Sequence, residues 1–223
     1  MDGIPQASLF LGIIPALIIL FLSLKGFEGK YKEKNMFLSF VVGLFLGFIA
    51  VSVRFLINAP PLIAVIIILM AFFDQFIKTI ILNLKRLQAK RATIIYGISL
   101  GLGFGSVFTP FLLIAASSSV EYNFYILSII TIGSIGIILF HSITAAFIGI
   151  GIYQKTLIKN IIIVIILQIP FNILFDLSRY LSDEFFYLIQ ICILMYGLVV
   201  YIFIFKKIIR PMIITSRRRS EKI

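Results

Sequence analysis

Seven continuous apolar stretches, each near the length of a membrane-crossing helix, constrain this chain more than any other feature. A helix rises about 1.5 Å per residue, so roughly 20 apolar residues match a hydrocarbon layer of about 30 Å. The runs lack the alternation that marks membrane β-barrel strands. The sequence therefore predicts an all-α, polytopic membrane protein with seven transmembrane helices. The predicted spans, of which the first and sixth are short, are residues 8–24, 36–57, 62–84, 92–116, 125–153, 160–175 and 185–205.

The composition agrees with a chain that lies almost wholly in the bilayer. Apolar residues make up 61% of the sequence and charged residues only 13%, which excludes an ordinary soluble domain. Residues 8–24 have no basic leader or small-residue cleavage site, so we expect an uncleaved first span. We expect one transmembrane domain over residues 1–223, multi-pass and integral, in the plasma membrane of a prokaryote.

The basic residues predict the orientation of the chain. The net charge is +11, and most of the lysines and arginines fall in alternate loops and in the C-terminal tail. The positive-inside rule places those segments in the cytoplasm, with the N-terminus outside and the C-terminus inside. Because the charges flank the spans, they indicate the lipid bilayer as the partner and exclude nucleic acid. The residues are Lys25, Lys30, Lys32, Lys34, Lys85, Arg86, Lys90, Arg91, Lys155, Lys159, Lys206, Lys207, Arg210, Arg217, Arg218, Arg219 and Lys222.

Few charged residues fall elsewhere. Arg179 is predicted in an outer loop beside Asp176, whereas Arg54 lies near the end of a span. Cys192 is the single cysteine and His141 the single histidine. They exclude a disulfide within the chain and cannot supply three ligands for a catalytic zinc ion, so we expect no metal and no cofactor.

Polar residues inside the predicted spans are the candidate functional groups. A polar group in hydrocarbon costs a few kcal/mol unless another polar group bonds to it, so we expect these side chains to face one another. Asp74 and Lys78 lie one helical turn apart. They form either an internal ion pair, with Lys78 reaching the inner interface, or a site in which Asp74 is a general base.

The other polar residues also have two interpretations. His141 either packs as a hydrogen-bonded core residue or transfers protons. Gln168 and Asn172 lie four residues apart, on one helix face, with Pro170 between them. Their amides either join helices or donate hydrogen bonds to an oxyanion. Pro170 is expected to kink the helix.

Glycines indicate close helix packing. Three recur at four-residue spacing in the fourth span, which lets a neighbouring helix approach. They are Gly97, Gly101 and Gly105, with further glycines at Gly43, Gly47, Gly133 and Gly136.

Taken in order, residues 62–176 resemble the PrsW and CAAX-prenyl-protease superfamily of membrane-embedded endopeptidases. The first family motif, Glu-Glu-x-x-Lys or Arg, is matched by Asp74, Gln75 and Lys78, with both glutamates replaced. The second, Gly-Leu-Gly-Phe-x-x-x-Glu-Asn, is matched from Gly101, with Phe108 in place of the glutamate.

Two further motifs complete the resemblance. The histidine of the third motif is retained as His141, and the fourth, His-x-x-x-Asn, is matched by Gln168 and Asn172. If activity is retained, the resemblance implies Asp74 as the base and His141 as a proton shuttle or electrophile. Gln168 and Asn172 would form the oxyanion hole.

The same superfamily includes the Aph scaffold subunit of γ-secretase, which this chain resembles in its span number, its orientation and its glycine-rich fourth span. The resemblance implies a catalytically degenerate pseudoenzyme that acts as a membrane scaffold or binds a partner helix. The first alternative is an active intramembrane endopeptidase that uses Asp74 on a helical peptide substrate. The second is a small-solute transporter or channel, which the lack of evident inverted repeats disfavours.

Overall fold

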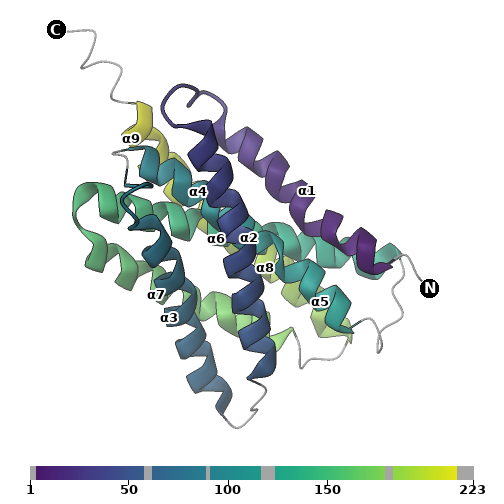
Figure 1. Cartoon of the computed structure of the whole chain (residues 1–223). Helices are drawn as coiled ribbons and strands as arrows, with labels where there is room; N and C mark the ends of the chain where they lie inside the picture. Colours follow the sequence, from purple (N-terminus) through teal and green to yellow (C-terminus); the bar gives the residue numbers. More distant parts are fainter. Residues whose placement is uncertain (1–3, 58–61, 89–90, 117–123, 179–182, 215–223) are drawn as a thin grey trace, which may run out of the picture.

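The computed structural model describes residues 4–57, 62–88, 91–116, 124–178 and 183–214, and every regular element in these ranges is a helix (Figure 1). Lys90, Arg179 and the tail arginines Arg217, Arg218 and Arg219 lie outside the described residues. The elements are α1 (Ile4–Leu24), α2 (Glu33–Leu56), α3 (Ile63–Leu82), α4 (Ala92–Ser106), α5 (Phe108–Ala116), α6 (Phe124–Gln154), α7 (Leu157–Leu177), α8 (Asp183–Ile204), the π-helical segment η2 (Phe205–Ile209) and α9 (Arg210–Ile214).

Within the described ranges, six helical stretches are long and apolar enough to cross a membrane. A shorter apolar helix, Phe10–Leu24, lies within α1. These stretches agree with the predicted helical, multi-pass membrane protein. The predicted first span, residues 8–24, is not among the six, so a seventh span stays a prediction. The six are Glu33–Leu56, Ile63–Leu82, Ala92–Ile114, Phe124–Gln154, Leu157–Leu177 and Phe185–Ile213.

The predicted fourth span, residues 92–116, agrees with one apolar stretch, Ala92–Ile114, but it is divided into two helices. α4 ends at Ser106 and α5 begins at Phe108, with a turn at Val107 between them. Pro110 has no N–H to donate to the carbonyl of Ser106, four residues earlier, so the helical ladder is interrupted there. The hydroxyl of Ser106 separately donates to the carbonyl of Gly103 at 2.8 Å, within α4.

Two other predicted boundaries were wrong. The sixth span is not short, because α7 runs from Leu157 to Leu177 and continues through Pro170. The last helix does not stop at residue 205 but continues through η2 to Ile214. Ile209 and Ile213 are buried on this continuation, so packing extends the helix past the first basic residues of the tail.

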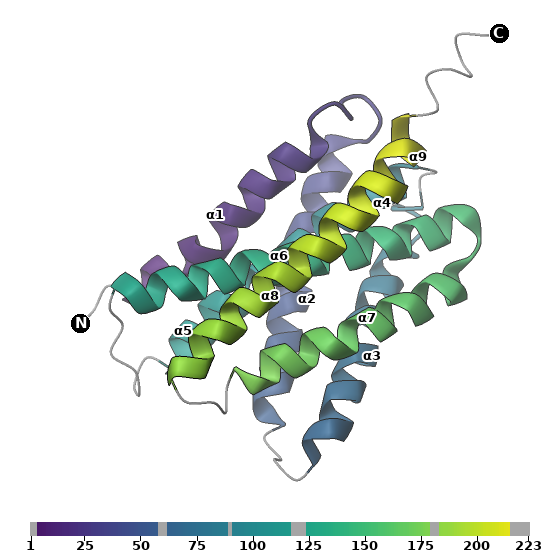
Figure 2. The same cartoon turned by 180° about the vertical axis from the view of Figure 1, so that it is seen from behind.

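α4 is the central helix of the bundle and lies between α2 and α6 (Figures 1 and 2). Glycines make the close approach possible. A Cβ atom at Gly103 would meet the carbonyl of Phe40 on α2, and one at Gly101 would meet the carbonyl of His141 on α6. The glycine spacing therefore predicted the packing correctly. It brings the backbone of α6 against α4 at His141, which fixes one side of the site described below.

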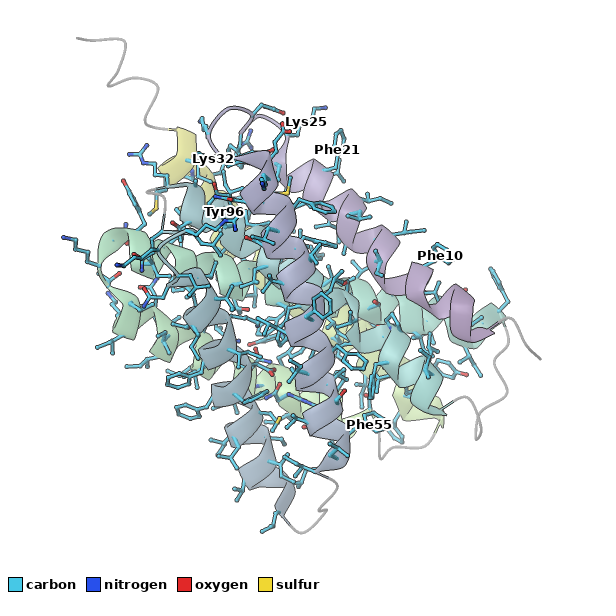
Figure 3. The ribbon with its side chains drawn as sticks, in the orientation of Figure 1. Phe10, Phe21, Lys25, Lys32, Phe55 and Tyr96 are labelled. Atoms are coloured by element: carbon cyan, nitrogen blue, oxygen red, sulfur yellow. The ribbon has the colours of Figure 1, made fainter. Side chains whose placement is uncertain are left out.

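The segments rich in basic residues meet at one end of the bundle. Lys30 Nζ donates to the carbonyl of Ile213 at 3.0 Å, which joins the segment after α1 to α9. Arg86 Nε donates to Asn35 Oδ1 at 3.4 Å, and Arg91 Nε donates to the hydroxyl of Tyr153 at 3.1 Å. Figure 3 shows Lys25 and Lys32 at this end and Phe55 toward the other.

Candidate polar site between α2, α3, α6 and α7

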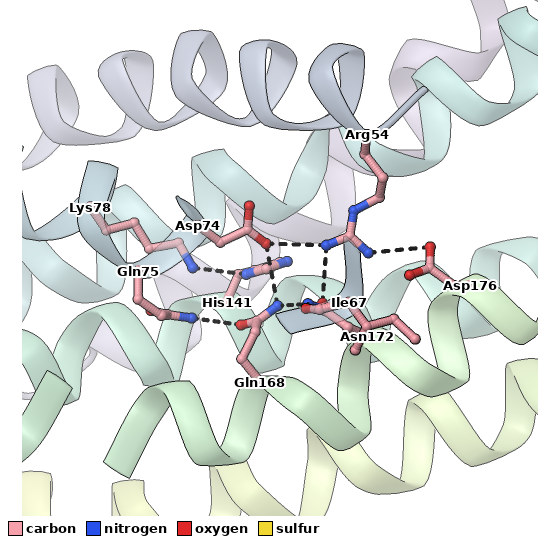
Figure 4. A network of polar contacts seen from close by, with 9 residues as sticks. All are labelled: Arg54, Ile67, Asp74, Gln75, Lys78, His141, Gln168, Asn172 and Asp176. Carbon is pink, nitrogen blue, oxygen red and sulfur yellow. Dashed lines mark hydrogen bonds and ion pairs between the residues drawn. The ribbon is translucent and has the colours of Figure 1, made fainter. Parts of the chain in front are cut away.

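Eight polar side chains from four helices form one buried cluster, here called the polar centre (Figure 4). On α3, Lys78 lies four positions after Asp74 and three after the adjacent Gln75, and the residues on α7 follow strict four-residue spacing. Each is at most 4% exposed. The members are Arg54 of α2, Asp74, Gln75 and Lys78 of α3, His141 of α6, and Gln168, Asn172 and Asp176 of α7.

Arg54 connects α2 to both α3 and α7. Its guanidinium lies 3.5 Å from Asp74 Oδ2 and 3.5 Å from Asp176 Oδ1, and it donates to Asn172 Oδ1 at 3.0 Å. The same group lies over the ring of Phe175, 5.1 Å from its centroid. A planar guanidinium has several N–H donors in a fixed fork, which suits a cation that serves three acceptors at once.

Lys78 does not form the ion pair with Asp74 that was one of the two interpretations of their spacing. Its Nζ atom lies 2.9 Å from Nδ1 of His141 and 4.3 Å from the centroid of Phe104. Lys78 is fully buried, so it does not reach the inner interface either. The spacing argument takes account of residues on a single helix only. In the structure the partners come from other helices: Arg54 of α2 lies beside Asp74, and His141 of α6 lies beside Lys78.

The two amides of α7 are bound within the cluster. Gln168 accepts a hydrogen bond from Gln75 Nε2 at 2.6 Å. Its own Nε2 donates to Asp74 Oδ2 at 3.3 Å and to Asn172 Oδ1 at 2.9 Å. Asn172 Nδ2 donates to the carbonyl of Ile67 at 3.0 Å. The amide donors are thus engaged by acceptors of the protein itself, and they join α3 to α7.

His141 lies in an aromatic enclosure. Its ring centroid is 4.8 Å from Phe104, 5.1 Å from Phe108, 5.7 Å from Phe140 and 5.5 Å from Phe171. Phe108 is the residue that stands at the glutamate position of the family motif. It is 1% exposed, and its ring packs beside that of His141.

The structure brings together all four candidate residues, Asp74, His141, Gln168 and Asn172. It adds Arg54 and Asp176, which the sequence did not assign to the site. Asp176 lies in α7 and is 4% exposed, so its prediction as a loop residue was wrong. Its signal was the spacing, because 168, 172 and 176 continue one helix face.

The polar centre is balanced in formal charge, and it offers no evident metal site. Arg54 and Lys78 are matched by Asp74 and Asp176, and both carboxylates are within 3.5 Å of Arg54. In the described part of the chain, no three His, Cys, Asp or Glu side chains gather in a group that could hold a metal ion.

Comparisons with protein-family models, with curated proteins and with solved structures find no match. The function is therefore inferred from the geometry of the polar centre and from the motif spacing.

Proposed function

We propose that this chain is a catalytically degenerate, PrsW-like intramembrane-protease-fold protein that acts as a membrane scaffold and binds a helix of a partner membrane protein. The observation that carries the proposal is the position of Phe108. Its ring lies 5.1 Å from that of His141 and 5.6 Å from that of Phe175, and the motif resemblance aligns this residue with a glutamate. An apolar ring there cannot take up or deliver a proton.

The internal bonding of the polar centre also supports a structural role. Arg54 pairs with the carboxylates of Asp74 and Asp176, and Lys78 contacts the imidazole of His141. The side-chain amides of Gln168 and Asn172 donate hydrogen bonds to α3. Loss of a positioned acid or base alone typically lowers a rate by about 10²–10⁴-fold. The amides of Gln168 and Asn172, which a hydrolase would turn toward a substrate, are here bonded to other residues of the protein.

The scaffold role requires surfaces on which a partner helix can pack. α3 and α8 each present a face of exposed, large apolar side chains, which serve equally for lipid and for another apolar helix. On α3 the exposed rings of Phe72 and Phe76 stack with centroids 6.4 Å apart. The exposed residues include Leu69, Phe72 and Phe76 of α3 and Leu188, Met195 and Val199 of α8.

We further propose seven spans, with the N-terminus outside and the C-terminus in the cytoplasm. The meeting of the basic segments at one end of the bundle supports this orientation. Arg54 and Asp176 lie near the C-terminal ends of α2 and α7, away from those segments. Arg54 and Asp176 would then lie in the outer half of the membrane, and Lys78, four residues before the end of α3, would lie toward the inner half.

The test is a hydrolysis assay with purified protein in liposomes and helical membrane peptides as substrates. Wild type, Asp74→Asn and a rebuilt variant carrying Asp74→Glu, Gln75→Glu, Phe108→Glu and Gln168→His are compared. We expect wild type to cleave no faster than Asp74→Asn. Robust cleavage by wild type that Asp74→Asn abolishes would contradict the proposal.

Photo-crosslinking tests the scaffold role directly. A photoreactive residue at Phe76 or Met195 is expected to give one discrete protein adduct in native membranes, with exposed Phe21 of α1 as the matched control position. Adducts with lipid alone at Phe76 and Met195 would count against a partner at these faces.

One observation favours an active endopeptidase instead. Asp74 Oδ1 and His141 Nε2 are buried atoms without a hydrogen-bond partner among the described residues. These are the two atoms that a base and a proton shuttle would use. In that case the same hydrolysis assay gives cleavage that depends on both Asp74 and His141.

A further inference from the structure

Four buried polar atoms of the polar centre have no hydrogen-bond partner among the residues that the structure describes. They are Arg54 Nε, Asp74 Oδ1, Gln75 Oε1 and His141 Nε2. Their residues are at most 2% exposed. Buried polar groups in native proteins are nearly always bonded, and in a membrane interior bulk water is not there to replace a missing partner. These atoms therefore indicate a ligand.

The hydrogen-bonding pattern fixes the character of each atom. With Lys78 in the charged state that balances the cluster, its ammonium group has only donors, so the 2.9 Å contact is made to an accepting Nδ1 of His141. We accordingly assign the imidazole proton to Nε2. Arg54 Nε is also a donor, whereas Asp74 Oδ1 and Gln75 Oε1 are acceptors. The unpaired atoms are thus two donors and two acceptors.

The charge and the packing of the site limit what can bind. The two cations and two carboxylates already balance, so an added ion would leave an uncompensated charge inside the membrane. The four aromatic rings around His141 lie 4.8 to 5.7 Å from its ring, centroid to centroid, and this close packing disfavours a bulky ligand. Figure 4 shows the imidazole edge opposite Lys78 turned toward the Arg54 side of the cluster.

We propose that the polar centre binds water as an internal ligand, held by Nε2 of His141 and Oδ1 of Asp74. Water donates and accepts, so one kind of molecule serves all four unpaired atoms without altering the charge. A water held in this way joins α6 to α3, which have no direct polar link at Asp74. The inference is independent of partner binding and of peptidase activity.

The single histidine permits a clean test by solid-state NMR of the full chain in lipid bilayers. Labelling with ¹⁵N-histidine reports only His141: its two ring nitrogens and its backbone amide. We expect an unprotonated Nδ1, a protonated Nε2, and rapid magnetisation transfer from water to the Nε2 proton. The backbone amide, deep inside α6, is the internal control and should receive far less.

Two variants sharpen the result. Asp74→Asn removes the anionic acceptor and should lower the transfer to Nε2 several-fold. Ser134→Ala removes another unpaired buried group on α6, two turns away, and should leave the transfer unchanged. A protonated Nδ1, no transfer to Nε2, or equal transfer to Nε2 and the backbone amide would each overturn the proposal. If the transfer from water to Nε2 in Asp74→Asn equals that in wild type, Asp74 does not bind the water and the proposal is contradicted.

Discussion

At the scale of single residues, Arg54 has the largest expected effect on stability. Its side chain serves three acceptors on two other helices. Removing one partner of a buried ion pair typically costs about 3–5 kcal/mol, because the remaining charge stays buried. We expect Arg54→Met to lower the unfolding free energy in micelles by an amount of that order.

The matched control is Arg86, whose side chain is exposed and bonds to Asn35 at 3.4 Å. Surface interactions of this kind contribute about 0–1 kcal/mol, so Arg86→Met should be nearly neutral. Equal losses in the two variants, measured by steric trapping or denaturant titration, would show that the Arg54 pairs do not hold the fold together.

The residues of the site were partly predictable. A polar side chain in an apolar helix needs a partner, and that rule alone predicted that Asp74, His141, Gln168 and Asn172 face one another. It could not identify the partners. The helical spacing made Lys78 one candidate partner of Asp74, but a cation from α2, Arg54, reaches Asp74 instead. Pairing between helices depends on rotations and depths that a single sequence does not show.

At the scale of elements, the glycines of α4 set its distance from α6. A Cβ atom at Gly101 would overlap the carbonyl of His141, whereas at Gly105 the nearest atom, Cα of Ile138, is 2.9 Å away. We expect Gly101→Ala to cost about 1–3 kcal/mol, the usual range for overpacking, and Gly105→Ala to cost less. Thermal unfolding of the two variants in the same detergent tests this order, and a larger loss for Gly105→Ala would contradict it.

The helices themselves were predictable because long apolar runs have few alternatives in a bilayer. The interruption at Val107 was not predicted, since the run from 92 to 116 is apolar on average and contains no charged residue. The sequence signal for it was Pro110, in the first turn of α5, which has no N–H to donate to the carbonyl of Ser106. The extension through η2 depends on the packing of Ile209 and Ile213, which hydropathy alone does not reveal.

At the scale of the whole molecule, the orientation makes a prediction for intact cells. With Cys192 replaced by alanine, a cysteine at Ser118 should react with a membrane-impermeant thiol reagent from outside, and one at Gln88 should react only after lysis. Labelling of Gln88 in intact cells would reverse the proposed topology. Equal expression of the two variants is the necessary control.

The distribution of charge over the helices of the polar centre has an electrical consequence. A charge that moves across the full membrane potential exchanges about 2.3 kcal/mol per 100 mV. α3 carries Asp74 and Lys78, so its displacement moves no net ionised charge from this cluster. α2 contributes Arg54 alone and α7 contributes Asp176 alone, and they are bound to each other. If α2 and α7 move together, Arg54 and Asp176 move as a neutral pair and the membrane potential does no net work on them. A gating current from these two charges would require the two helices to separate.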